Sequence, residues 1–162
     1  MNILSIIKII FLSLSTALIL AGCSVVPKVL PEPAFSRLLP EQASDITIYA
    51  VGLVGTPYRY GGNTPDSGFD CSGLIGYVYQ SRAGFTPPRT VSRMQNWGQP
   101  VTSDSARSGD LVLFSKSGVA THAGIYVGAG RFVHAPSTGG EVRLDLLTSK
   151  YWSKQQIVFR RP

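Results

Sequence analysis

The second half of the chain alternates short apolar segments with glycine-containing turns, and this pattern restricts the fold more than any other feature. The segments cover residues 110–114, 122–127 and 131–135, and weaker ones lie near 142–144 and at 156–160. Segments of this length, bounded by turn residues, are typical of β-strands. Gly128-Ala129-Gly130 joins two of them at the length of a hairpin connection. The second half is therefore predicted to form an antiparallel sheet.

Helical patterns come earlier in the chain. Three helices are expected, over residues 44–54, 71–83 and 91–97. Asp70 is a favourable N-cap for the second helix and Gly84 a favourable stop, while Thr90 can cap the third. Cys71 is thus expected in the first turn of a helix. Helices followed by antiparallel strands predict an α+β fold, with the N-terminal helices packed on the sheet.

The N-terminus has the composition of an export signal, with Lys8 followed by an apolar run that extends to Leu20. Leu20-Ala21-Gly22-Cys23 resembles the processing site of bacterial lipoproteins. This resemblance implies that residues 1–22 are a signal peptide and that Cys23 becomes the lipidated first residue, anchored in the membrane by its acyl chains. The alternative is a retained transmembrane helix, for which the apolar run is short. Ser24 resembles the sorting pattern for the outer membrane, facing the periplasm, with the inner membrane as the alternative.

Residues 23–43 are rich in proline and have little periodicity, so they are predicted to be a flexible tether. The folded domain is then expected over residues 44–162. Removing residues 1–22 takes Lys8 with them and lowers the formal net charge from +6 to +5. Such a surface favours anionic partners such as cell-wall polymer or lipid head groups. Nucleic acid is not expected, because no basic cluster with interleaved aromatic residues is present.

The segment 58–68 is rich in glycine and other turn-forming residues. Such a loop lets the backbone pass close to a neighbouring element. No phosphate-binding spacing follows the loop, so a nucleotide site is not predicted.

The chain has two histidines, His122 and His134, and both lie in the predicted hairpin. If residues 128–130 form the connection, residue 124 faces 134. The two imidazoles then project from the same face as diagonal neighbours, roughly 7 to 8 Å apart at the backbone. A two- or four-residue connection would shift the register by one and turn the histidines to opposite faces.

Three readings of this histidine pair remain open from the residues alone. The pair can bind a metal ion with Cys71 as a further ligand, pack in the core, or take part in nucleophilic catalysis with Cys71. Cys71 itself can be a buried packing residue, a disulfide partner of Cys23, or a nucleophile. A position at a helix N-terminus favours the thiolate and is expected to lower the pKa of Cys71.

Six blocks of the sequence resemble, in order, those of the NlpC/P60 cysteine peptidases. They are Tyr58-Arg59-Tyr60-Gly61-Gly62, Asp70-Cys71-Ser72-Gly73, Pro88-Arg89-Thr90, Ser108-Gly109-Asp110-Leu111-Val112-Leu113-Phe114, His122-Ala123-Gly124-Ile125-Tyr126 and Phe132-Val133-His134-Ala135. With the lipoprotein signal, the whole chain resembles the small NlpC/Spr-type lipoproteins. The resemblance implies a papain-like α+β fold. Ser108 departs from the family pattern, which usually has proline there.

The resemblance also implies roles for single residues. Cys71 would be the nucleophile, His122 the base and His134 the residue that orients it. Tyr58, rather than Tyr60, would bind the oxyanion of a tetrahedral intermediate together with the Cys71 backbone N–H. Arg89 would receive a substrate carboxylate through a bidentate contact, with a plain surface arginine as the alternative.

The function implied by the resemblance is hydrolysis of amide bonds in the stem peptides of peptidoglycan, without a metal or another cofactor, by a monomer. The bond cleaved would be the γ-D-glutamyl to diaminopimelate bond or the cross-link between D-alanine and diaminopimelate. The alternatives are a catalytically silent wall-binding lipoprotein and a thiol acyltransferase on the same fold.

Overall fold

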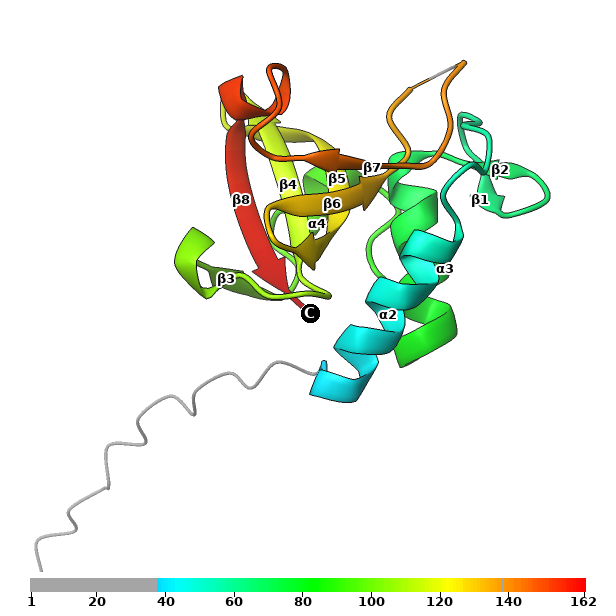
Figure 1. Cartoon of the computed structure of the whole chain (residues 1–162), viewed down its shortest axis with the longest axis horizontal. Coiled ribbons are helices and arrows are strands. Elements are labelled where there is room, and N and C mark those ends of the chain that lie inside the picture. The colour runs from blue at the N-terminus through cyan, green and yellow to red at the C-terminus, as the bar shows by residue number, and fades with distance from the viewer. Residues whose placement is uncertain (1–37, 138) are drawn as a thin grey trace, which may run out of the picture. The chain divides into compact units, whose positions relative to one another are not determined.

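The computed structural model describes residues 38–137 and 139–162 (Figure 1). The helices are α2 (Pro40–Gly52), α3 (Cys71–Ala83) and α4 (Val91–Met94), with 3₁₀ turns at Ser103–Ser105 and Trp152–Lys154. The strands are β1 (Asn63–Thr64), β2 (Gly68–Phe69), β3 (Gln99–Val101), β4 (Leu111–Lys116), β5 (Val119–Gly128), β6 (Arg131–His134), β7 (Arg143–Leu146) and β8 (Gln156–Arg161).

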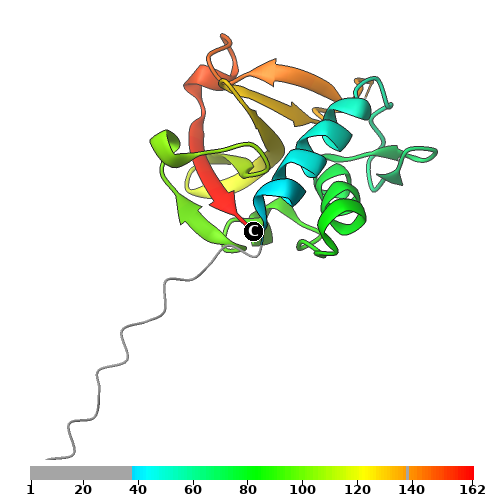
Figure 2. The same cartoon turned by 60° about the horizontal axis from the view of Figure 1, so that its bottom comes forward.

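Six of the strands form one antiparallel sheet in the order β3-β8-β4-β5-β6-β7, and β1 pairs with β2 in a small separate hairpin. The helices α2 and α3 pack against each other and both contact β5. Figures 1 and 2 show them side by side along one side of the sheet. The predicted α+β architecture, with N-terminal helices on an antiparallel sheet, is confirmed.

The alternation of side chains along the strands divides the core into two clusters. On β4, Leu111 and Leu113 join the cluster that the helices cover, whereas Val112 and Phe114 join a second cluster with Trp152. Side chains on both faces of the sheet are thus buried, and those opposite the helices pack with Trp152. Within the described residues, no helix combines the length and the apolar character that crossing a bilayer requires.

The first described helix begins earlier than predicted. The sequence pattern predicts a helix that starts at Ser44, but α2 begins at Pro40, and the backbone N–H of Leu39 donates to the Gln42 side chain at 3.0 Å. Proline is favoured at the first helical position because it has no N–H to leave unpaired. The predicted tether therefore overlaps the first turn of α2, while residues 1–37 lie outside the described residues.

Other boundaries also differ from the predictions. The helix predicted over 91–97 ends at Met94, and the short strands β1, β2 and β3 were not predicted. Each of these strands has two or three residues, which is too short for an alternating pattern to be detected.

The histidine hairpin has the predicted register but a different connection. The turn consists of two residues, Ala129 and Gly130, both with positive φ, at 49° and 69°. A two-residue turn alone would have moved the histidines to opposite faces. A bulge between Tyr126 and Gly128 offsets it, so that Ile125 pairs with Val133 as the predicted register requires.

Candidate active site

Cys71 is the first residue of α3, as predicted. The Asp70 side chain caps the helix by accepting a hydrogen bond from the Gly73 backbone N–H at 2.7 Å. Gly84 ends the helix with a positive φ of 71°. The cap holds the backbone on either side of Cys71, so the thiol occupies a fixed place at the helix N-terminus.

Asp70 also connects this helix to two other segments. It accepts from the Gly61 backbone N–H at 3.0 Å and from both terminal nitrogens of Arg89, each at 2.8 Å. Arg89 donates to the Ser72 hydroxyl as well. Burial alone would raise the pKa of Asp70, but the hydrogen bonds from Arg89 and Gly73 outweigh it and hold this pKa below its ordinary value. Asp70 is therefore an ionised anchor of the site.

The bidentate contact expected of Arg89 is made within the chain, to Asp70, while the Arg89 side chain stays about half exposed at 49%. The structure thus gives Arg89 an internal partner. Its predicted contact with a substrate carboxylate would compete with that partner.

The glycine-rich loop approaches the start of α3 backbone to backbone. The Asp70 N–H donates to the Gly62 carbonyl at 3.1 Å, and a Cβ added at Gly73 would collide with the same carbonyl oxygen. The neighbour that the loop composition predicted is therefore the start of α3. Glycine is required at position 73 because only a residue without a side chain allows this approach.

His122 and His134 lie together, on neighbouring strands. Nε2 of His122 and Nδ1 of His134 are 2.9 Å apart, and the ring centroids are separated by 5.0 Å with the rings nearly perpendicular. His134 is fully buried. A bulge beside Thr121, where β4 pairs with β5, directly precedes His122. Bulges next to functional sites re-aim a side chain, which is the effect expected here.

The thiol of Cys71 lies close to β5 at the position after His122, since the backbone N–H of Ala123 hydrogen-bonds to it and lowers its pKa. Burial is the larger effect, however, and with the neighbouring Asp70 charge it raises the pKa of Cys71 above the ordinary value. The expectation that the helix N-terminus would lower this pKa is therefore wrong in its net direction. The resting site holds a neutral thiol.

Both histidines are also neutral at ordinary pH. Burial, reinforced by the adjacent His134, lowers the pKa of His122 to about 3. Burial lowers the pKa of His134 to about 4, although the hydrogen bond to Asp145 opposes the shift. A neutral imidazole carries a lone pair and can accept a proton from a thiol. These protonation states suit removal of a thiol proton during attack rather than a preformed thiolate.

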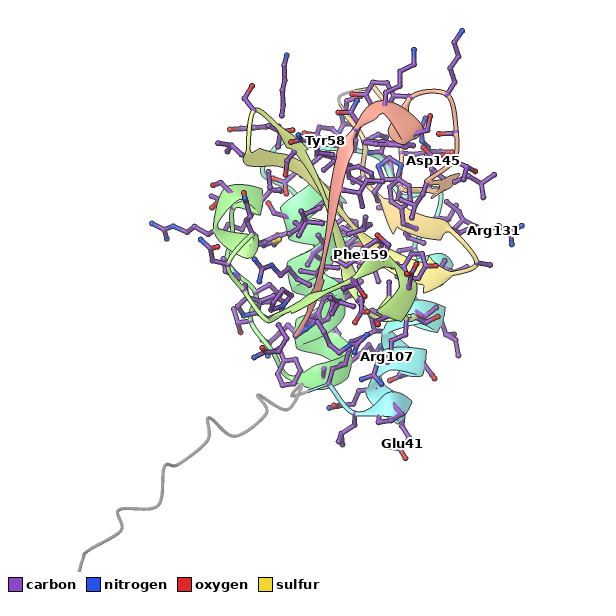
Figure 3. The ribbon with its side chains drawn as sticks, turned by 90° about the vertical axis from the view of Figure 1, so that its left-hand side faces the viewer. Glu41, Tyr58, Arg107, Arg131, Asp145 and Phe159 are labelled. Atoms are coloured by element: carbon purple, nitrogen blue, oxygen red, sulfur yellow. The ribbon has the colours of Figure 1, made fainter. Side chains whose placement is uncertain are left out.

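Tyr58 lies in the loop between α2 and β1, where its N–H donates to the Gly140 carbonyl at 2.8 Å. Burial, followed by the influence of Cys71, raises the pKa of Tyr58, so its hydroxyl keeps its proton and can donate it to an oxyanion. Tyr60 is 92% exposed, in keeping with the choice of Tyr58. Figure 3 shows Tyr58 and Asp145 toward the same end of the domain, away from Glu41.

Asp145, on β7, is a further residue of the site that the sequence pattern does not identify. Its Oδ2 atom accepts from Nε2 of His134 at 3.1 Å, from Nε1 of Trp152 at 2.8 Å and from Arg143 at 2.9 and 3.1 Å. The alternation Leu144-Asp145-Leu146 predicts that the leucines face inward, but both are more than 40% exposed and the acidic side chain between them turns inward, so no sequence signal pointed to it. The predicted strand ended at residue 144 and so did not include it.

The alternatives for Cys71 and the two histidines included a disulfide with Cys23 and a metal site. Cys71 carries a free thiol, and Cys23 lies outside the described residues. In the part of the chain that the structure describes, no three His, Cys, Asp or Glu side chains gather in a group that could hold a metal ion. The facing ring nitrogens of the two histidines are instead occupied by each other.

The chain is similar to known proteins over the region that contains this site. The model of the NlpC/P60 family matches residues 55–161. The NlpC/P60 domain of the peptidoglycan hydrolase SagA superposes with a TM-score of 0.64 at 30% identity, covering 72% of this chain and 96% of that domain. The site described above lies within the matched region.

Two curated relatives are similar over the same region. The murein DD-endopeptidase MepH of Escherichia coli K12 is 39% identical over 112 residues, covering 67% of this chain and 41% of the relative. The gamma-DL-glutamyl hydrolase of Bacillus subtilis 168 is 42% identical over 111 residues, covering 67% of this chain and 26% of the relative. The chain therefore matches less than half the length of either protein.

Proposed function

The chain belongs to the NlpC/P60 family, and on that basis we propose that it is a cysteine peptidase that hydrolyses amide bonds in peptidoglycan stem peptides. The observation that carries the proposal is the 2.9 Å hydrogen bond between His122 and His134, with the Cys71 thiol beside the residue after His122. The names of the relatives, a murein endopeptidase and a peptidoglycan hydrolase, support the substrate class.

The first half of the reaction forms a thioester. His122 takes the proton of the Cys71 thiol as the sulfur attacks the carbonyl carbon of the scissile amide, and the carbonyl oxygen becomes an oxyanion that accepts a hydrogen bond from Tyr58. The imidazolium of His122 then returns the proton to the leaving nitrogen. The C–N bond breaks, an amine departs, and the acyl group remains on Cys71.

The second half uses the same residues on water. His122 removes a proton from water as its oxygen attacks the thioester carbonyl, and Tyr58 again stabilises the oxyanion. The C–S bond breaks, the sulfur recovers a proton from His122, and a carboxylic acid leaves. Each turnover therefore consumes one water and produces one amine and one carboxylic acid.

Digestion of purified muropeptides by the purified protein tests this function. We expect new amine termini and new carboxyl termini in equal amounts, and the residue bearing the new amine or carboxyl group identifies which of the two candidate bonds is cut. Prior alkylation with iodoacetamide should abolish both products, because the reaction needs a free thiol on Cys71.

The other candidate functions predict different products. A wall-binding protein without turnover would retain muropeptides and release nothing, and a thiol acyltransferase would place the acyl group on an added amine and yield a new amide. Either result, or cleavage that survives alkylation, would contradict the proposed hydrolysis.

We propose in addition that residues 1–22 are removed and that Cys23 is lipidated, which would anchor the protein to the outer membrane facing the periplasm. The support is the order of an apolar run followed by Leu20-Ala21-Gly22-Cys23 and then Ser24. Mass analysis of the N-terminal peptide of the protein isolated from a Gram-negative host checks this. An N-terminal peptide that begins at Met1, or an unmodified Cys23, would contradict it.

A further inference from the structure

The histidine pair is hydrogen-bonded to further side chains that have no role in the proposed mechanism. Asp145 accepts hydrogen bonds from His134, Trp152 and Arg143, and all of them are directed at one oxygen, Oδ2. Arg143 is opposite His134 in the register of β6 and β7, and Asp145 is two residues further along the same face. The sheet therefore places the carboxylate as a diagonal neighbour of the buried imidazole.

The ionisation of Asp145 determines what this oxygen can do. Burial by itself would raise the pKa of Asp145, but the hydrogen bonds from Trp152 and His134 lower it below the ordinary value. An ionised carboxylate only accepts hydrogen bonds. The partner nitrogen, Nε2 of His134, must therefore carry a proton.

The proton on Nε2 of His134 determines which of the other ring nitrogens in the pair carry protons. His134 is neutral and protonated on Nε2, so its Nδ1 has a lone pair and accepts. The atom 2.9 Å away, Nε2 of His122, must then be the donor. Because His122 is neutral as well, the remaining nitrogen of that ring, Nδ1, is left unprotonated.

We propose that Asp145 is a positioning residue that fixes the tautomers of both histidines, so that Nδ1 of His122 is the basic nitrogen that receives the Cys71 proton. This role rests on the proposed function for its catalytic meaning, because it specifies the base of that reaction. The arrangement itself is a property of the resting protein and can be measured without substrate.

Trp152 stabilises the arrangement from two directions. Its Nε1 donates to Asp145, and its ring stacks on His122 with centroids 5.2 Å apart and planes 23° from parallel. The same ring meets His134 edge-on at 5.1 Å. One side chain thereby restrains both imidazoles and the carboxylate that orders them, which limits rotation of the rings out of the hydrogen-bonded line.

Nitrogen-15 NMR of the histidine rings of the full-length protein at neutral pH tests the inference directly. We expect pyrrole-type signals from Nε2 of both histidines and pyridine-type signals from both Nδ1 atoms. Protonation of Nδ1 on His122 in the wild-type protein would overturn the proposal, whatever the protein does to muropeptides.

Two substitutions separate the accepting oxygen from other roles of the residue. Asp145→Ala removes the acceptor and should give mixed tautomers and a kcat lower by roughly 10- to 100-fold, the loss seen when a metal-binding histidine loses the partner that orients it. Asp145→Asn keeps an oxygen among the same donors and should retain the tautomers and more of the rate. Wild-type tautomers in Asp145→Ala, or equal losses in the two variants, would contradict the proposal.

The matched control is Asp104→Ala, which removes an exposed carboxylate from the 3₁₀ turn at Ser103–Ser105. It should leave the ring signals and the rate unchanged. If the wild-type protein shows the expected tautomers but cleaves no stem peptide, the proposed function fails while the assignment of the imidazoles stands.

Discussion

Replacing Cys71 with alanine is expected to reduce muropeptide cleavage on the order of 10⁶-fold, to the background rate, as removal of the nucleophile does in other hydrolases that form acyl-enzymes. His122 and Tyr58 cannot compensate, because without the sulfur no thioester forms and water must attack the amide directly. The rate is measured by chromatography of a soluble stem peptide over a range of enzyme concentrations. Thermal unfolding followed by circular dichroism should show a folded variant, because alanine also suits the first turn of α3.

Cys23→Ala is the matched control for this experiment, because it removes the other cysteine of the chain. On a soluble stem peptide it should retain the full rate. A Cys71→Ala variant that keeps more than about 1% of the wild-type rate would show that the thiol is not the nucleophile, since loss of a covalent nucleophile costs far more than that.

The buried pair of Asp110 and Arg161 gives the largest expected change in stability. Asp110 is fully buried and accepts two 2.8 Å hydrogen bonds from Arg161, which joins the start of β4 to the last strand. Arg161→Met leaves the carboxylate without its counter-charge. The free energy of unfolding should fall by about 3–5 kcal/mol, the usual cost of breaking a buried ion pair on one side only. Urea unfolding measured by tryptophan fluorescence provides the value.

A second substitution tests the cause of that loss. Asp110→Asn combined with Arg161→Met leaves no buried charge and should recover part of the stability, whereas Arg131→Met, on an exposed arginine, should cost less than about 1 kcal/mol. A double variant no more stable than Arg161→Met alone would mean that lost packing, and not the uncompensated charge, explains the effect.

The parts of the fold that could be predicted from the sequence are those that local chemistry determines. The Asp70 cap and the Gly84 stop fixed both ends of α3, and the strand pattern fixed the sheet. The connection at Ala129 was not predictable in the same way. Two connections place His122 and His134 on the same face: a two-residue turn with a bulge, and a three-residue turn without one. The sequence pattern does not distinguish these two connections.

The parts of the site that could not be predicted depend on contacts between distant segments. Asp145 belongs to the site only through its hydrogen bonds with His134 and Trp152. The register of β6 and β7 and a 3₁₀ turn bring these two residues to it. Likewise, the net pKa of Cys71 depends on burial by the assembled domain, which outweighs the local effect of the helix. Local sequence rules describe the helix end but not the environment into which it is folded.

The two ends of the described domain meet, since the N–H of Leu38 donates to the carbonyl of Pro162 at 3.2 Å. Leu38 leads into α2, whose first turn holds Glu41, and Figure 3 shows Glu41 at the end of the domain away from Tyr58 and Asp145. The point where the two ends meet therefore lies toward the end of the domain remote from Tyr58 and Asp145.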